Sequence, residues 1–189
     1  MKLITSLSIA LIFIILSASR CKKDPINPVD QLPPETQTGA NTFGCLVNGQ
    51  AFKPGGLQLS GGSLNCIYQL IYNDPINGRV FGISAGKRYS NGDVRNIGFG
   101  LDSIGIIEGV TYNLESRAKG NGYGQHAYYS LPSSSDIYQT NNIVKGSVTF
   151  KRFDLVNQVA SGTFWFNAVN SNGDTARITD GRFDVRYTQ

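Results

Sequence analysis

GTFWFNAVNSNGDTARITDGRFDVRY, residues 162–187, is the stretch of sequence that decides the fold. Apolar and polar residues alternate from Gly162 to Val169 and again from Thr175 to Tyr187, and Ser171-Asn172-Gly173-Asp174 joins the two runs. Two alternating runs around a short Asn-Gly turn predict a β-hairpin with one face turned to a core.

The same pattern continues toward the N-terminus. Asn-Gly occurs five times in the chain, and this pair favours tight hairpins because both residues accept positive φ. No window keeps a helical period over about 12 residues. The predicted strands are Thr42–Val47, Gln50–Lys53, Leu64–Tyr72, Arg79–Tyr89, Val94–Leu101 and Ile143–Leu155, besides the two of the last hairpin. Residues 41–189 are therefore expected to form an all-β domain, an antiparallel β-sandwich or partly open barrel built of hairpins.

The apolar positions of these strands predict the core. It should contain Phe43, Phe52, Phe81, Ile97, Phe99, Val148, Phe150, Phe164, Phe166, Phe183 and Val185. Glycines at positions 82, 98 and 100 interrupt two of the strands and are expected to mark bulges or bends.

Composition and charge fit an ordinary globular domain. The chain is 40% hydrophobic and 16% charged, with a formal charge of +4. Lys2 and Arg20 precede Cys21, so the rest of the chain holds 15 basic against 13 acidic residues, a net charge of +2. The basic residues form no long block, and no nucleic-acid partner is expected.

Residues 1–20 have the order of a secretory signal peptide. A positive start is followed by an apolar run of 14 residues, Leu3 to Leu16, and by the small residues 17–19. The run is short of the roughly 20 residues of a membrane-spanning helix. Cys21 follows, and the arrangement resembles a bacterial lipoprotein signal, in which this cysteine is lipidated. Arg20 and Ala18 depart from that signal, and cleavage after Ser19 is the alternative.

The number of cysteines bears on whether Cys21 carries a lipid anchor, because an odd number leaves one thiol unexplained in an exported chain. If Cys21 carries lipid, Cys45 and Cys66 remain. They either form a disulfide, worth roughly 3 kcal/mol for a loop of this length, or are two buried free thiols. Neither they nor the single histidine have zinc spacing, so no metal and no cofactor are expected.

Residues 21–40 are predicted to be a lipidated cysteine and a proline-rich tether. The stretch KKDPINPVDQLPPETQTGA, residues 22–40, holds four prolines and few large apolar residues. Such a segment is not expected to fold, and it could extend to about 60 Å. Its start, Cys21-Lys22-Lys23-Asp24, resembles the segment that sorts some outer-membrane lipoproteins to the cell surface.

Three stretches carry a family resemblance. TGANTFGCLVNGQAF (residues 38–52), SGTFWF (161–166) and ITDGRFDVRY (178–187) resemble parts of small bacterial outer-membrane lipoproteins that contain a β domain of unknown function. The resemblance implies an exported lipoprotein with a β fold. It carries over no catalytic residue.

His126 is the only histidine, so a Ser-His-Asp hydrolase would have to use it. It lies in the glycine-rich stretch of residues 120–126, which is expected to be a loop, and no Gly-x-Ser-x-Gly motif is present. The acids Asp180 and Asp184 flank a strand with no sign of burial. No catalytic residue is therefore assigned, and the protein is expected not to be an enzyme.

Four tyrosines, Tyr123, Tyr128, Tyr129 and Tyr138, fall within a polar stretch that is also expected to be a loop. Tyrosines in polar loops either stack on a ligand such as a glycan or fold back over a core. They are the candidate ligand-binding aromatics.

The sequence thus predicts a non-catalytic binding or structural module of the cell envelope. It should be held to the outer membrane by a lipid, with secretion as the alternative location. An envelope protein or a glycan is the expected partner. The alternatives are a glycan-binding accessory lipoprotein and a small envelope hydrolase.

Overall fold

The computed structural model describes residues 26–56, 63–71, 78–130 and 134–189. Within these residues the chain forms eleven strands and one short 3₁₀ helix, η1 (Pro28–Gln31). The strands are β1 (Thr42–Val47), β2 (Gln50–Phe52), β3 (Leu64–Leu70), β4 (Arg79–Arg88), β5 (Val94–Asp102), β6 (Thr111–Glu115), β7 (Gly122–Ser130), β8 (Ser134–Gln139), β9 (Gly146–Asp154), β10 (Val159–Val169) and β11 (Thr175–Arg186).

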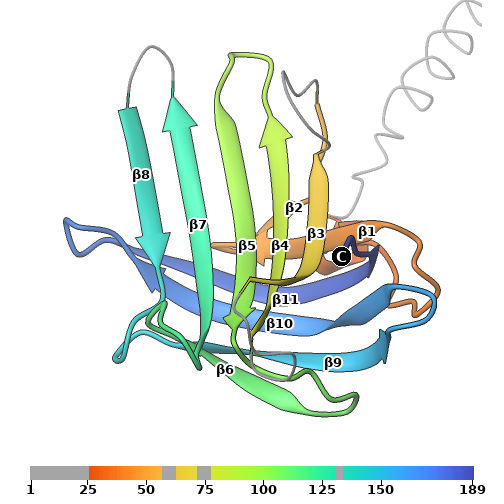
Figure 1. The fold of residues 1–189 in the computed structure, drawn as a ribbon. Helices are drawn as coiled ribbons and strands as arrows, with labels where there is room; N and C mark the ends of the chain where they lie inside the picture. Colours follow the sequence, from red (N-terminus) through yellow and green to blue (C-terminus); the bar gives the residue numbers. More distant parts are fainter. Residues whose placement is uncertain (1–25, 57–62, 72–77, 131–133) are drawn as a thin grey trace, which may run out of the picture.

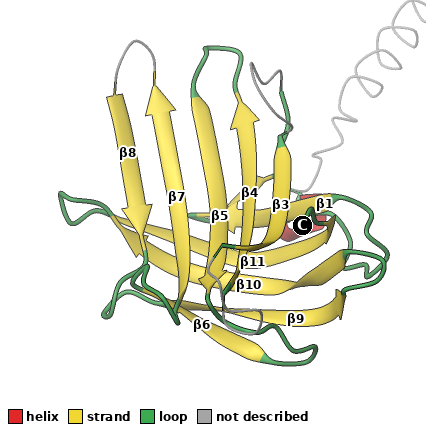
Figure 2. Cartoon of the chain, viewed as in Figure 1, coloured by secondary structure: helices red, strands yellow, loops and turns green. Residues whose placement is uncertain are grey.

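All the strands belong to one sheet that folds over itself into two layers. The order is β2-β1-β11-β10-β9-β6-β7-β5-β4-β3, and β8 pairs with β7 and, through one residue, with β10. Strands β3, β4, β5, β7 and β8 form the front layer in Figure 1, and β1, β11, β10, β9 and β6 cross behind it. Figure 2 shows how the loops connect the two layers at their margins.

The layers form a partial ring and not a closed barrel. At one margin β6 and β7 make a short parallel pair, so the sheet is mixed. At the other, β3 meets the chain just after β11: the amide of Thr188 donates to the carbonyl of Cys66 (3.0 Å), and the amide of Tyr68 donates to the carbonyl of Thr188 (2.8 Å). The predicted fold class is confirmed.

Aromatic rings from both layers fill the space between them. The ring of Phe81 in β4 lies 5.1 Å from that of Phe150 in β9, and the ring of Phe99 in β5 lies 5.0 Å from that of Phe164 in β10. Such tilted and edge-to-face pairs add about 0.5–1.5 kcal/mol each beyond the apolar area that they bury. All eleven residues predicted for the core are buried, none more than 3% exposed.

Three strands were not predicted: β6, β7 and β8. The stretch expected to be a glycine-rich loop is instead the start of β7. A Cβ on Gly124 would lie 2.7 Å from the ring of Phe166, and one on Gly122 would lie 2.4 Å from the carbonyl of Asn113. These glycines therefore let β7 pass close over β6 and β10, which is a tertiary role and not a turn.

The expected bulges at glycines 82, 98 and 100 are also wrong. Strands β4 and β5 pair in unbroken register, with Gly82 opposite Gly100 and Ser84 opposite Gly98. A Cβ on Gly98 would lie 2.3 Å from the carbonyl of Ile83. Glycine is needed here because the neighbouring backbone approaches closely.

The N-terminal segment, residues 26–40, is not a free tether, contrary to the prediction. Leu32 is buried, and Pro33 lies over Gly44 of β1, where a Cβ would meet the proline ring at 2.5 Å. Further along, Glu35 forms an ion pair with Lys151 of β9. The segment thus packs across one end of the outer face of the back layer.

Asp184 of β11 holds this segment. It is 1% exposed, and its carboxylate accepts hydrogen bonds from the hydroxyl of Thr36 (2.6 Å), the amide of Gly39 (2.7 Å) and the amide of Thr38 (2.9 Å). Burial alone would raise the pKa of Asp184, but the hydrogen bonds from the segment outweigh it and lower the pKa. The carboxylate is the acceptor for a turn of chain that would otherwise leave its amide groups unpaired.

We expect Asp184→Asn to lower the free energy of unfolding by about 2–4 kcal/mol, because an amide cannot accept all of these hydrogen bonds. The same contribution should disappear in acid: it is present above the ordinary carboxyl pKa near 4 and is lost as the pH falls through the lowered pKa. Urea denaturation at pH 7 and pH 3 measures both effects. Asp180→Asn, at an exposed position of the same strand, is the matched control. Equal stability of the two variants would contradict this role.

Candidate functional site

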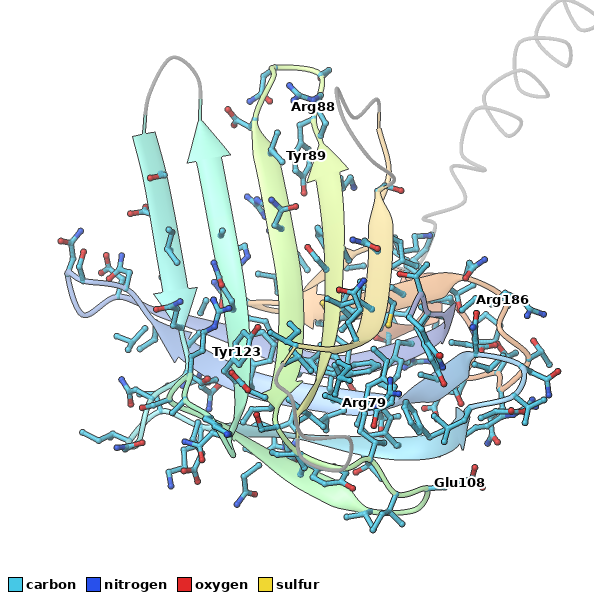
Figure 3. The ribbon with its side chains drawn as sticks, viewed as in Figure 1. Arg79, Arg88, Tyr89, Glu108, Tyr123 and Arg186 are labelled. Carbon is cyan, nitrogen blue, oxygen red and sulfur yellow. The ribbon has the colours of Figure 1, made fainter. Side chains whose placement is uncertain are left out.

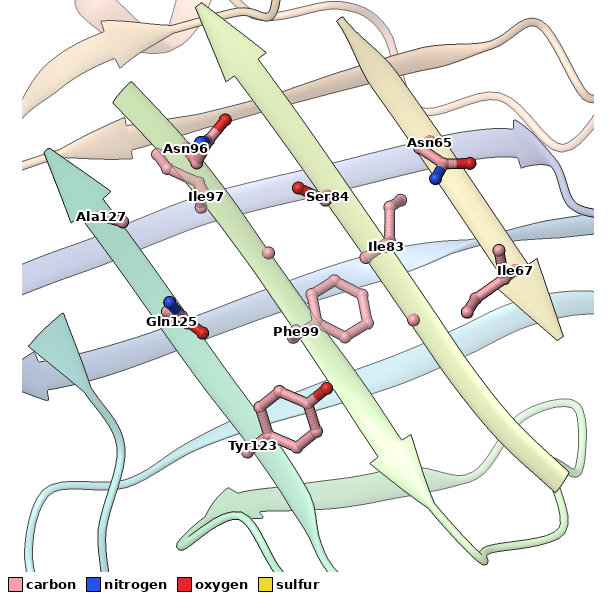
Figure 4. A pocket seen from close by; sticks show the side chains of 12 residues that line it. Asn65, Ile67, Ile83, Ser84, Asn96, Ile97, Phe99, Tyr123, Gln125 and Ala127 are labelled. Carbon is pink, nitrogen blue, oxygen red and sulfur yellow. The ribbon is translucent and has the colours of Figure 1, made fainter. Parts of the chain in front are cut away.

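A shallow groove runs over the outer face of β3, β4, β5 and β7, on the near side of the molecule in Figure 1. Two rows of residues cross these strands in register. One row is Ile67, Gly82, Gly100 and Tyr123, and the other is Asn65, Ser84, Gly98 and Gln125. Larger side chains stand on the outer strands and small ones on the inner strands, so the cross-section is concave (Figure 4).

Glycines make the floor of this groove. A Cβ on Gly100 would lie 2.8 Å from the hydroxyl oxygen of Tyr123, whereas one on Gly82 would meet Ile67 only at 3.5 Å. The bare backbone at Gly100 therefore gives Tyr123 room to lie over β5. Figure 4 shows the phenol ring between β7 and β5, with its hydroxyl directed toward β5.

Tyr123 offers the groove its hydroxyl and not an open ring face. The guanidinium carbon of Arg117 lies over the ring, 4.8 Å from its centroid. A cation–π contact at an exposed site is worth about 0.5–1 kcal/mol. A ligand would have to displace Arg117 before it could stack on this tyrosine. Figure 3 shows Tyr123 at the lower part of the front layer, away from the Arg88 and Tyr89 end of β4.

The groove is chemically neutral. Its volume is about 330 Å³, and among the twelve described residues that line it the polar groups are amides, hydroxyls and backbone. Asn65, Ser84, Asn96 and Gln125 can each donate and accept hydrogen bonds. Ile67 and the phenol of Tyr123 add apolar walls. Such a surface suits an uncharged polar ligand, because it holds no charge that would need a counter-charge.

The four candidate tyrosines do not form one platform. Tyr123, Tyr128 and Tyr129 lie in β7 and Tyr138 lies in β8, so the expected loop is wrong. Tyr138 is opposite His126, on the inner face of the front layer, while Tyr123 is on the outer face. The side chains of Tyr128 and Tyr129 lie outside the described part of the structure.

His126 is buried on β7 and not in a mobile loop. Its ring stacks on Tyr138 at 5.6 Å between centroids, and its Nδ1 lies 3.2 Å from the carbonyl oxygen of Asn96. Neither contact resembles a general base between a nucleophile and a carboxylate. Burial lowers the pKa of His126, as does the charge of Arg95, against the opposing effect of the backbone hydrogen bond.

A second hollow of about 300 Å³ lies beside this histidine. It brings together His126, Tyr138, Arg95, Asp136 and the turn at Asn48 between β1 and β2. Here tertiary structure brings together titratable groups from distant parts of the chain. Its histidine is neutral at pH 7, because the lowered pKa lies further below that pH than the ordinary value does.

Cys45 and Cys66 are both buried as free thiols, so the possible disulfide is absent and the alternative of two buried thiols is found. Cys45 faces the core from β1 in the back layer, and Cys66 faces it from β3 in the front layer. Burial raises the pKa of both thiols. They pack as small apolar side chains of the core.

The remaining findings concern the export signal, metal binding and membrane-spanning helices. The signal segment and the lipidation site Cys21 lie outside the described residues. Among the described residues, no group of three or more His, Cys, Asp or Glu side chains could hold a metal ion. In the same part of the chain, no helix has the length and apolar character needed to cross a membrane.

Sequence reasoning missed the groove, although a signal for it is present. In the middle of β4 and β5 the large apolar residues Phe81, Ile83, Ile97 and Phe99 face the core, and the residues next to them are Gly82, Ser84, Gly98 and Gly100. Two strands with small residues at the outward positions of their middle parts predict a depression if they are neighbours. Only the register shows that they are, and that β3 and β7 supply the walls.

One family model matches part of the chain. Residues 96–185 match a domain of unknown function (DUF6252). This range runs from β5 to β11 and contains the SGTFWF stretch, whereas residues 38–52 lie before it. No curated protein and no solved structure was found to match the chain.

We expect the buried, neutral His126 to make the fold less stable as the pH falls below about 6.5, because the unfolded chain then takes up a proton that the folded state resists. The slope cannot exceed about 1.4 kcal/mol per pH unit for one group. His126→Phe keeps a ring against Tyr138 and cannot be protonated. Urea midpoints at pH 7.5 and 5.5 should differ less in this variant than in the wild type. An unchanged difference would mean that other groups cause the pH dependence.

Proposed function

We propose that this protein is an exported, lipid-anchored, non-catalytic binding module of the cell envelope. The groove on the outer face of β3, β4, β5 and β7 is its ligand site. The observation that carries the proposal is the neutral lining of the groove: amides, hydroxyls and glycine backbone can hold a polar ligand, but they include no general base or charged nucleophile.

Because the N-terminal segment packs on the domain, a lipid on Cys21 would limit the distance between the domain and the membrane. Six residues, 22–27, lie between Cys21 and Pro28, where the chain joins the domain in η1. The seven steps from Cys21 to Pro28 span at most about 25 Å, so a lipid on Cys21 would hold the domain close to the membrane surface. The proposed location is the outer membrane.

The two alternatives have less support from the geometry. Glycan binding by the tyrosines 123–138 would need one platform, but Tyr123 and Tyr138 lie on opposite faces of the front layer. A hydrolase centred on His126 would need a nucleophile and a carboxylate at the ring, whose described contacts are with Tyr138 and Asn96.

The anchor predicts the mass of the mature protein. When the full chain is made in a Gram-negative host, membrane fractions should contain a chain that begins at acylated Cys21. After denaturation without reductant, an alkylating agent should add to two thiols, because Cys45 and Cys66 are free. Cys21→Ser should move the protein to the soluble fraction. A soluble wild-type chain that begins at Arg20 would refute lipidation.

The groove predicts a loss of ligand binding when its floor is filled. Ser84 is exposed on the floor, so Ser84→Trp should fold normally and exclude a ligand. Ser171→Trp, at an exposed position between β10 and β11, is the control. Native mass spectrometry of the membrane-extracted protein and calorimetry with uncharged oligosaccharides and end-capped peptides measure binding. We expect at least a tenfold weaker affinity for Ser84→Trp, equivalent to about 1.4 kcal/mol. No difference between the two variants in either measurement would contradict the groove as a binding site.

A further inference from the structure

The only tryptophan of the chain, Trp165, lies on the outer face of the back layer, opposite the side that carries the groove. It stands between Phe164 and Phe166 in β10, and both of these side chains are buried in the core. Trp165 points the other way and is 47% exposed. A large aromatic side chain in the middle of a sheet face, half open to solvent, is a candidate anchor for a ligand.

Small polar side chains of β9 and β6 lie beside this ring. Ser147 of β9 lies opposite Trp165, and Thr149 lies opposite Thr163. The row continues into β6, where the hydroxyl of Thr111 is 2.8 Å from that of Thr149. The surface next to the ring therefore offers hydroxyl groups and leaves the indole exposed.

Trp165 separates two hollows along β10. One has a volume of about 320 Å³ and lies on the side of Thr163, where Glu35 of the docked N-terminal segment forms a wall. The other has about 400 Å³ and lies on the side of Asn167, bounded by residues 143–145. Thr163 and Asn167 are about 13 Å apart at roughly 3.3 Å per strand residue. The site is thus elongated, with an aromatic ring at its centre.

An arginine flanks Trp165 on each side. Arg182 of β11 lies opposite Thr163, and Arg177 lies opposite Asn167. Within the described part of the chain neither forms an ion pair, whereas Lys145 is paired with Glu115 and Lys151 with Glu35.

The two ends of the site differ in charge. Asp180 shares the first hollow with Arg182, and a neighbouring carboxylate and guanidinium suit hydroxyl groups. The second hollow holds Arg177 and Lys145 and no carboxylate among the described residues that line it. That end suits a carboxylate of the ligand, which arginine binds through two parallel hydrogen bonds.

We propose that the Trp165 face, formed by Ser147, Thr163, Trp165, Asn167, Arg177 and Arg182, binds an oligosaccharide that contains uronic acid units. One sugar ring stacks its apolar face on Trp165. A neighbouring unit presents its carboxylate to Arg177, and hydroxyl groups on the other side meet Thr163, Asp180 and Arg182. This site is independent of the groove, because the two lie on opposite outer faces of the layers.

A sugar fits this face better than a protein or a lipid surface does. The core of a protein interface is usually a cluster of several aromatic and aliphatic side chains. This face has one aromatic side chain with hydroxyls beside it, and its aliphatic residues, Ile143 and Val144, line only the hollow at one end. Side chains that dock on membranes project from the surface, whereas Trp165 is held within a sheet between two hollows.

The single tryptophan makes the test direct. Titration of the full-length protein with uronate-containing oligosaccharides, covering glucuronate, galacturonate and mannuronate, should change the tryptophan fluorescence. Neutral oligosaccharides of the same length should bind roughly tenfold more weakly or not at all, since they lack the contact with Arg177. Calorimetry should show a loss of roughly tenfold or more for Trp165→Ala.

Matched variants separate this site from the groove and from a structural effect. Arg177→Gln should remove the preference for acidic over neutral sugars without loss of stability, and Arg186→Gln, another exposed arginine of β11, should keep it. Gly82→Ala alters the groove floor and should leave the fluorescence titration unchanged. The proposal is overturned if none of the acidic sugars changes the fluorescence, if Trp165→Ala binds like the wild type, or if only vesicles of anionic phospholipid produce the response.

Discussion

The structure depends on the aromatic contacts that join the two layers of its one sheet. Phe99 of β5 lies 5.0 Å from Phe164 of β10 and 5.4 Å from Phe183 of β11, measured between ring centroids. A single sheet has no core of its own, so its apolar face becomes buried only when the sheet folds over itself. These rings make that fold-over favourable, and they fix which face of every strand is turned inward.

The inner faces of the strands are buried in the core, so the outer faces remain available to bind a ligand. In the front layer the outward residues in the middle of β4 and β5 are glycines and a serine, and this makes a neutral groove between β3 and β7. The back layer carries Trp165 among hydroxyls, with an arginine on each side. The alternation of side chains along each strand thus buries the phenylalanines and places a different surface on each side of the molecule. A substitution can therefore remove one proposed site and leave the other intact.

The N-terminal segment connects this fold to its proposed anchor. Asp184 holds residues 36–40 through hydrogen bonds to a buried carboxylate, and Leu32 and Pro33 pack on β1. A chain lipidated at Cys21 would therefore present the domain in a restricted orientation. The segment also forms one wall of the hollow beside Trp165, through Glu35, so the mode of attachment and the shape of that face are linked.

Local pattern determined much of this protein. Alternation in the sequence located eight of the strands and all eleven predicted core residues, because the side-chain period of a strand is a property of consecutive residues. The order of charge, apolar run and small residues predicted export in the same way. Tertiary structure alone decided the rest. The sequence pattern does not predict strand β7, because the glycines of this strand are there to allow close approach to β6 and β10. It predicts an unfolded N-terminal segment, because Asp184, whose carboxylate accepts the hydrogen bonds of that segment, lies at the far end of the chain. Which outward residues share a row, and so form a groove or a platform, depends on register between strands that are distant in sequence, and no local pattern contains that information.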